Sequence, residues 1–211
     1  MEAVVFDLDG VVVNTEKYWN MAEKEIYEEI LDSEEIDSSE LAGMSITNTY
    51  NYLSENYEVS VSLEEFFEMY EERAENIYIN KAEIMPNLKN LISELREKGL
   101  KIGLATGSYW PKFVIKRFDL DFDAIAHSGM IEGSGKPEPE TYLLAVKKLK
   151  TEPEECIAID DTDAGISSAK DAGLYCIGYE GSDGQSLSRA DETVSNPREF
   201  RKRLMALTDT Q

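Results

Sequence analysis

Beyond residue 86 the sequence alternates short apolar runs with segments whose apolar residues recur at helical spacing, and this alternation constrains the fold more than any other feature. It predicts strands at 101–106, 123–127, 156–160 and 174–178, and helices at 86–98, 110–117, 138–149, 163–172 and 197–207. The run Ala3-Val4-Val5-Phe6 predicts a buried first strand. Because strands that alternate with helices form a parallel sheet, we expect an α/β core with a Rossmann-like sheet.

Residues 16–84 separate the first strand from the others and have a different composition, with 19 acidic and 4 basic side chains. Apolar residues recur there at helical spacing, as at Ile26, Ile30, Phe66 and Tyr70, which predicts amphipathic helices. We therefore expect a small helical cap over 15–84, inserted into an α/β core formed by 1–14 and 85–211.

Polar clusters follow the predicted strands at the points where the strands end. They are Asp7 and Asp9, then Thr106-Gly107-Ser108, then Lys136, and finally Asp160 and Asp161. In parallel α/β sheets the carboxyl ends of the strands form the ligand crevice. The sequence therefore predicts that these clusters meet in one site.

The chemistry of these side chains favours phosphoryl transfer with Mg²⁺. Mg²⁺ prefers hard oxygen ligands, which Asp7 and Asp161 supply, whereas Asp160 either binds the cation or supports its neighbours. Lys136, the Thr106 hydroxyl and the backbone N–H groups of Gly107 and Ser108 would hold the phosphate oxygens. Because the sequence shows no serine–histidine pair, the expected nucleophile is a carboxylate.

At these residues the sequence resembles the haloacid dehalogenase (HAD) superfamily. Its first motif is similar to Asp7-Leu8-Asp9-Gly10-Val11-Val12-Val13-Asn14-Thr15-Glu16. Its second, third and fourth motifs are similar to Thr106, to Lys136 in Lys-Pro-Glu-Pro-Glu, and to Asp160-Asp161-Thr162-Asp163-Ala164-Gly165-Ile166. The four motifs occur in order, and the helical insertion falls where that family places its C1 cap.

The resemblance implies a role for each motif residue. Asp7 would attack phosphorus, and Asp9 would protonate the leaving oxygen and then activate water, while its backbone carbonyl contacts Mg²⁺. Thr106 and Lys136 would hold the phosphoryl group, and Asp160 and Asp161 would complete the metal site. Dehalogenases of the superfamily lack the second acid because a halide needs no proton, so Asp9 favours a phosphatase.

Within the superfamily the chain is most similar to β-phosphoglucomutases and small sugar-phosphate phosphatases. Four positions where the mutases carry a histidine or basic groups are occupied here by Trp19, Ala42, Ile46 and Tyr109. We therefore expect a hydrolase that acts on a sugar or polyol phosphate. Two alternatives stay open, a β-phosphoglucomutase-like phosphotransferase and a regulatory or binding protein without activity.

Each motif also has a structural interpretation. Thr106 could cap a helix, Lys136 could lie in a surface loop, and Asp163 is the acid expected to cap the helix that follows it. Aromatic residues of the insertion such as Phe66 and Tyr70 are expected to form its core, whereas Trp19 fits either the core or the substrate pocket.

The formal net charge of −22 excludes nucleic acid and anionic membranes as partners. It is typical either of a solvated acidic surface or of adaptation to high salt. No apolar run approaches the ~20 residues that span a bilayer, and no signal peptide is evident. The two cysteines, Cys156 and Cys176, are expected as buried thiols. These features predict a cytoplasmic monomer that binds a small phosphorylated metabolite.

Overall fold

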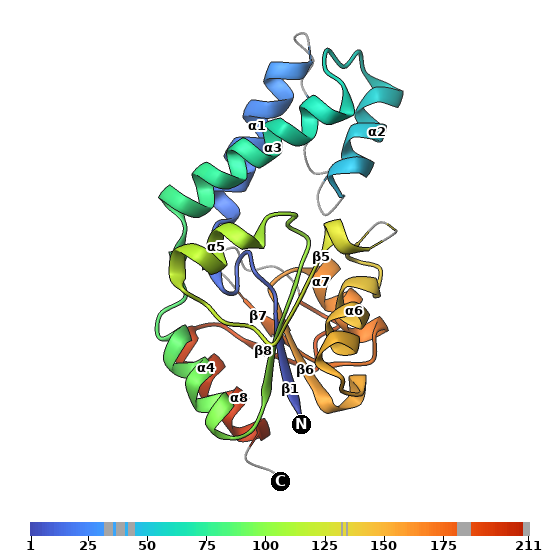
Figure 1. Ribbon diagram of the computed structural model, residues 1–211. Coiled ribbons are helices and arrows are strands. Elements are labelled where there is room, and N and C mark those ends of the chain that lie inside the picture. The colour runs from blue at the N-terminus through green and yellow to red at the C-terminus, as the bar shows by residue number, and fades with distance from the viewer. Residues whose placement is uncertain are drawn as a thin grey trace.

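The computed structural model describes residues 1–31, 36, 41, 45–131, 133, 135–180 and 187–208. Its main sheet has six parallel strands in the order β5-β4-β1-β6-β7-β8 (Figure 1). Their bounds are β1 (Ala3–Phe6), β4 (Lys101–Thr106), β5 (Ala124–His127), β6 (Cys156–Asp160), β7 (Tyr175–Tyr179) and β8 (Glu192–Val194). The prediction of a parallel α/β sheet with a helical insertion is confirmed.

Helices cover both faces of the sheet. On one side lie α4 (Leu88–Glu97), α5 (Pro111–Phe118) and α8 (Pro197–Thr208), and on the other lie α6 (Glu140–Leu149) and α7 (Asp163–Asp171) (Figure 1). Strand β1 is buried on both faces, since Val4 and Phe6 pack into the first core and Ala3 and Val5 into the second. This double burial explains why β1 reads as a continuous apolar run.

The insertion lies beyond the carboxyl ends of the strands (Figure 1). It contains α1 (Glu16–Ile30), α2 (Ile46–Asn56), α3 (Leu63–Asn76) and a short π-helix, η2 (Ile77–Lys81). The two segments that connect the insertion to the rest of the chain pair as a small antiparallel sheet, β2 (Val13–Asn14) with β3 (Glu83–Ile84). None of the described helices has both the length and the apolar character needed to cross a membrane.

Several boundaries differ from the predicted ones. Helix α4 begins at Leu88 rather than at Pro86. The reason is that Asn87 has a left-handed φ of 64°, which cannot be part of a right-handed helix. The strands β2, β3 and β8 were not predicted, since each has only two or three residues and therefore shows no periodic pattern.

Candidate functional site

The site lies at the carboxyl end of the central strand β1, where the strand order of the sheet changes direction. Strand β1 lies between β4 and β6, and β5 continues the sheet on one side while β7 and β8 continue it on the other. Ligands bind at such a switch point, outside the carboxyl ends of the strands. Asp7 directly follows β1, Thr106 ends β4 and Asp160 ends β6, so the register of these three strands places the residues side by side.

A cavity of about 570 Å³ opens at this edge of the sheet. All the predicted site residues line it except Asp160, which lies just behind: Asp7, Asp9, Thr106, Gly107, Ser108, Lys136 and Asp161. Residues of the insertion form another part of the cavity wall, including Trp19, Ile46 and Tyr70. The structure therefore brings the four motifs together.

Lys136 joins two of the predicted acids. Its Nζ donates to Asp7 Oδ1 at 2.5 Å and to Asp160 Oδ2 at 2.6 Å, and its side chain is 10% exposed. Burial disfavours the charged amine, but the carboxylates of Asp160 and Asp7 outweigh burial and raise the pKa of Lys136. The raised pKa favours the charged ammonium form, which lies in hydrogen-bond contact with Asp7.

Asp160 is fully buried and its acceptor sites are occupied. Oδ2 accepts hydrogen bonds from Lys136 and from the Tyr142 hydroxyl at 2.7 Å, and Oδ1 accepts from the Thr162 hydroxyl and N–H at 2.9 and 3.1 Å. Gly165 provides the space, because a Cβ there would lie 2.0 Å from the carboxylate. This arrangement favours Asp160 as the residue that positions Lys136.

Asp161 has the opposite environment. It is buried, and its Oδ1 has no hydrogen-bond partner. Gly10 packs against it with a φ of +85°, and a Cβ on Gly10 would lie 1.7 Å from Oδ2. Burial raises the pKa of Asp161 to about 9, with further contributions from Asp160 and Asp7, and burial likewise raises the pKa of Asp7 to about 7.

These acids fit a divalent cation. One carboxylate oxygen each from Asp7, Asp160 and Asp161 lie within 4.8 Å of one another. Hard oxygen donors at this spacing suit Mg²⁺, and a cation would satisfy the unpartnered oxygen of Asp161. Because hydrogen bonds already occupy Asp160, we expect Asp7 and Asp161 to be the principal carboxylate ligands.

The acids predict how stability depends on pH and on Mg²⁺. A carboxyl whose pKa is raised in the folded state binds a proton that the unfolded chain has released. In EDTA the melting temperature should therefore fall as the pH rises from about 4 towards 9. This pH window lies between the ordinary pKa of an aspartate and the raised pKa of Asp161. Mg²⁺ should raise the melting temperature at pH 8 because it replaces those protons. In Asp161→Asn the increase in melting temperature with Mg²⁺ should be smaller than in the wild-type protein. An equal increase in the two proteins would contradict Asp161 as a ligand of the cation.

Asp9 is held by donors from the inserted segment over 15–84. Thr15 Oγ1 and Trp19 Nε1 donate to its Oδ1 at 2.5 and 3.2 Å, and the Tyr78 hydroxyl donates to its Oδ2 at 2.8 Å. Burial raises the pKa of Asp9, and these three hydrogen bonds offset part of that rise. A carboxyl with a raised pKa suits an acid that must carry a proton to a leaving group.

The structure excludes the alternative in which Thr106 caps a helix, and the predicted cap by Asp163 is wrong. Thr106 caps no helix, because α5 begins at Pro111, and its hydroxyl instead accepts from the Ser108 N–H at 3.0 Å. The side chain that caps α7 belongs to Thr162, which accepts from the Gly165 N–H at 3.0 Å, and Asp163 is the first residue of the helix. Asp163 is therefore free to line the cavity.

Sequence reasoning missed two tyrosines. Tyr142 donates to Asp160, and Tyr78 lies between Asp9 and Ser108, with its hydroxyl 2.9 Å from Ser108 Oγ. Neither belongs to a polar cluster at a strand end, because Tyr142 lies in α6 and Tyr78 in η2. Trp19 lines the cavity and also packs against the core, so both of its interpretations apply. Tyr70 is buried in the core as predicted and lines the cavity as well.

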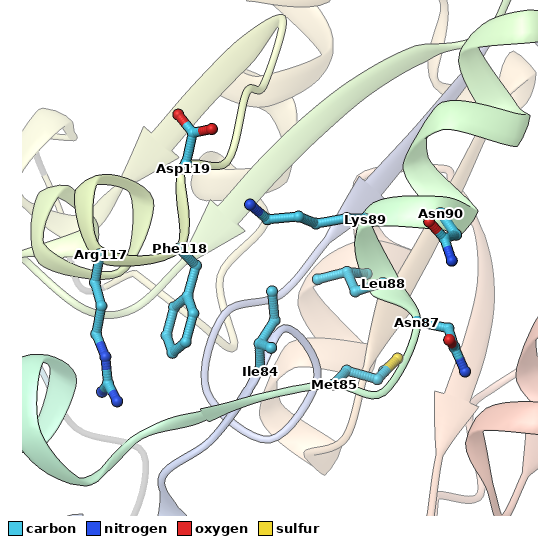
Figure 2. A pocket seen from close by; sticks show the side chains of 9 residues that line it. All are labelled: Ile84, Met85, Asn87, Leu88, Lys89, Asn90, Arg117, Phe118 and Asp119. Atoms are coloured by element: carbon cyan, nitrogen blue, oxygen red, sulfur yellow. The ribbon is translucent and has the colours of Figure 1, made fainter.

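A second hollow, of about 340 Å³, lies beside strand β3 (Figure 2). Its walls include Ile84, Met85, Lys89 and Arg117, and the Arg117 guanidinium donates to the Tyr78 carbonyl at 2.7 Å. None of the predicted site residues lines this hollow. The cavity that contains Asp7 is therefore the candidate active site.

Comparisons with known proteins agree with this geometry. Residues 1–173 match the family model of the haloacid dehalogenase-like hydrolases. The chain is 32% identical to β-phosphoglucomutase of Bacillus subtilis (92% of this chain, 89% of that protein) and 29% identical to the phosphorylated carbohydrates phosphatase of Thermotoga maritima (90% and 91%). It superimposes on the crystal structure of Clostridium difficile β-phosphoglucomutase with a TM-score of 0.78 and 28% identity, covering 99% of this chain and 96% of that one. From its motifs, its fold and these matches, the chain belongs to the haloacid dehalogenase-like hydrolases.

Proposed function

We propose that the protein is a Mg²⁺-dependent phosphomonoester hydrolase that acts through an aspartyl-phosphate on a small sugar or polyol phosphate. The observation that carries the proposal is the contact between Lys136 and Asp7, beside the unpartnered carboxylate oxygen of Asp161. This arrangement supplies a nucleophile, a fixed positive charge and the ligands of a cation in one cavity.

In the first step the Asp7 carboxylate attacks phosphorus, and the bond to the leaving oxygen breaks. Lys136 and the Thr106 hydroxyl stabilise the charge on the equatorial oxygens. A Mg²⁺ ion held by Asp7, Asp161 and the Asp9 carbonyl would neutralise further phosphate charge. Asp9 gives its proton to the leaving oxygen, which departs as an alcohol.

In the second step Asp9, now a carboxylate, takes a proton from water. The resulting nucleophile attacks phosphorus, so that inorganic phosphate leaves and Asp7 is regenerated. The donors on Asp9 from Thr15, Trp19 and Tyr78 keep the carboxyl oriented through both steps.

The insertion over 15–84 would serve as a cap that covers the cavity and selects substrates. Its two connecting segments lie side by side, with Val13 paired to Ile84 and Asn14 to Glu83. Two adjacent short strands allow rotation of the cap about one axis, which would admit substrate and then exclude water.

The cavity favours a phosphatase over a mutase. Three of the four positions that depart from the mutase pattern, Trp19, Ile46 and Tyr109, line the cavity and carry no positive charge. The fourth, Ala42, lies outside the described residues. A mutase must grip a distal phosphate while its aspartyl-phosphate is kept from water, and these side chains offer no cation for that purpose.

Phosphate release separates the candidate functions. With Mg²⁺ we expect the protein to hydrolyse p-nitrophenyl phosphate and to release inorganic phosphate from sugar monophosphates. With β-glucose 1-phosphate and a glucose 1,6-bisphosphate primer, we expect phosphate and glucose but no glucose 6-phosphate. Efficient isomerisation with little phosphate release would establish the mutase alternative. A folded protein that turns over none of these esters would favour the non-enzymatic alternative.

A further inference from the structure

One face of α1 forms a wall of the catalytic cavity. Glu16, Trp19, Asn20 and Glu23 all line the cavity, and their spacing of i, i+3, i+4 and i+7 places them on one side of the helix. Towards its C-terminus the same side carries Ile26 and Ile30, which are buried in the core, whereas the opposite side carries exposed residues such as Glu25 and Glu28. Glu23 is therefore a carboxylate that the helix directs towards the substrate space.

The surroundings of Glu23 fix its position. Tyr70 is buried and hydrogen-bonds to the Glu23 carboxylate, and the Tyr70 hydroxyl lies 3.1 Å from that of Tyr27. The Trp19 ring stacks on Tyr70 with a centroid distance of 6.2 Å and an interplanar angle of 23°. Burial raises the pKa of Glu23 to about 7, partly offset by the Tyr70 hydrogen bond.

Among the described residues, Glu23 forms no ion pair with a lysine or arginine. The lining residues include one such cation, Lys136, which already pairs with Asp7 and Asp160. Within the insertion, Lys24 pairs with Glu28, and Arg73 pairs with Glu25 and Glu29. Lys17 and Lys81 both lie over the Tyr18 ring. The residues outside the described ranges include no Lys, Arg or His in the sequence, so none of them can supply a countercharge.

We propose that Glu23 is a specificity-determining residue that accepts hydrogen bonds from hydroxyl groups of the leaving alcohol. An ionised carboxylate has about four acceptor sites, and Tyr70 fills one of them. Asn20, Ser45 and Thr49 also line the cavity and add neutral donors and acceptors. This combination suits a polyhydroxylated group, because each hydroxyl both donates and accepts.

The same carboxylate would exclude a second phosphate from the leaving group. Two anions that share a cavity repel each other, and no free cation of the described wall compensates. An ammonium group is the other ligand that a carboxylate attracts, but it can only donate hydrogen bonds, whereas hydroxyl groups can use both the donors and the acceptors of Asn20, Ser45 and Thr49. The inference rests on the proposed phosphatase activity and narrows its substrates to neutral polyhydroxylated monoesters.

The test compares Glu23→Gln with Glu28→Gln, a control on the same helix whose side chain is 67% exposed. Substrates are glucose 6-phosphate, phosphoethanolamine and p-nitrophenyl phosphate, assayed at pH 8, and glucose 1,6-bisphosphate is tested as an inhibitor. In Glu23→Gln we expect KM for glucose 6-phosphate to rise about tenfold, as for loss of a hydrogen bond to a charged group, with kcat nearly unchanged. We expect turnover of p-nitrophenyl phosphate to stay constant, because it has no hydroxyl for Glu23. Inhibition by the bisphosphate should strengthen, and more so in Glu23→Lys.

Three results would overturn the inference while leaving the phosphatase in place. They are an unchanged KM for glucose 6-phosphate in a folded Glu23→Gln, an equal change in Glu28→Gln, and a wild-type preference for phosphoethanolamine that Glu23→Gln abolishes. The last would identify Glu23 as an ammonium site. If the wild-type protein fails to hydrolyse even p-nitrophenyl phosphate, the proposed function itself is wrong, so the two failures are distinguishable.

Discussion

Replacing Asp7 with asparagine should abolish turnover while the fold persists. The amide is almost isosteric but cannot form an acyl-phosphate, so kcat should fall at least roughly 10⁴-fold, as when other enzymes lose their nucleophile. The fold should tolerate the change because Lys136 keeps its second partner, Asp160, at 2.6 Å. Burial also raises the pKa of Asp7 to about 7, so the charge of Asp7 contributes little to the stability of the wild-type fold.

The measurement combines steady-state turnover of p-nitrophenyl phosphate, a thermal melt and acid-quenched labelling from a radioactive phosphate ester. We expect hydroxylamine-labile label in the wild-type protein and none in Asp7→Asn. Asp163→Asn is the matched control, because this acid lines the same cavity but lies outside the cluster of Asp7, Asp160 and Asp161. Substantial activity or label in Asp7→Asn would show that another group attacks phosphorus.

Much of the site was predictable because it follows from sheet topology. Asp7 and Lys136 are 129 positions apart, yet the rule that ligands bind at the carboxyl ends of parallel strands placed both in one crevice. The prediction needed only the apolar runs and the polar residues that end them. The same reasoning separated the acidic helical insertion from the core.

The remaining features depend on contacts that no local pattern encodes. Tyr78 reaches Asp9 from the far end of the insertion, 69 positions away, and Tyr142 reaches Asp160 from the body of α6. In the sequence both are aromatic residues of amphipathic helices, and only packing reveals that their hydroxyls point at carboxylates.

Replacing Lys136 with methionine should damage both stability and catalysis. Methionine keeps most of the side-chain volume but removes the charge that Asp7 and Asp160 share, and both carboxylates are buried. Removing one partner of a buried ion pair typically costs about 3–5 kcal/mol, because the remaining charge is left without compensation. Loss of one preorganised donor to the phosphoryl group should also lower kcat by about 10²–10³.

The stability loss should depend on pH, which distinguishes lost charge from lost packing. Burial raises the pKa of Asp7 and Lys136 lowers it, so without Lys136 it should rise further above its present value of about 7. The folded mutant then binds a proton that the unfolded chain releases, so its stability deficit in EDTA should grow as the pH rises from 5 to 8. The control is Lys112→Met, which breaks a pair with Glu71 in which the lysine side chain is 63% exposed and should cost less than about 1 kcal/mol. Equal stability losses of Lys136→Met at pH 5 and pH 8 would show that Lys136 acts through packing. Turnover by Lys136→Met at the wild-type rate would show that Lys136 has no part in catalysis.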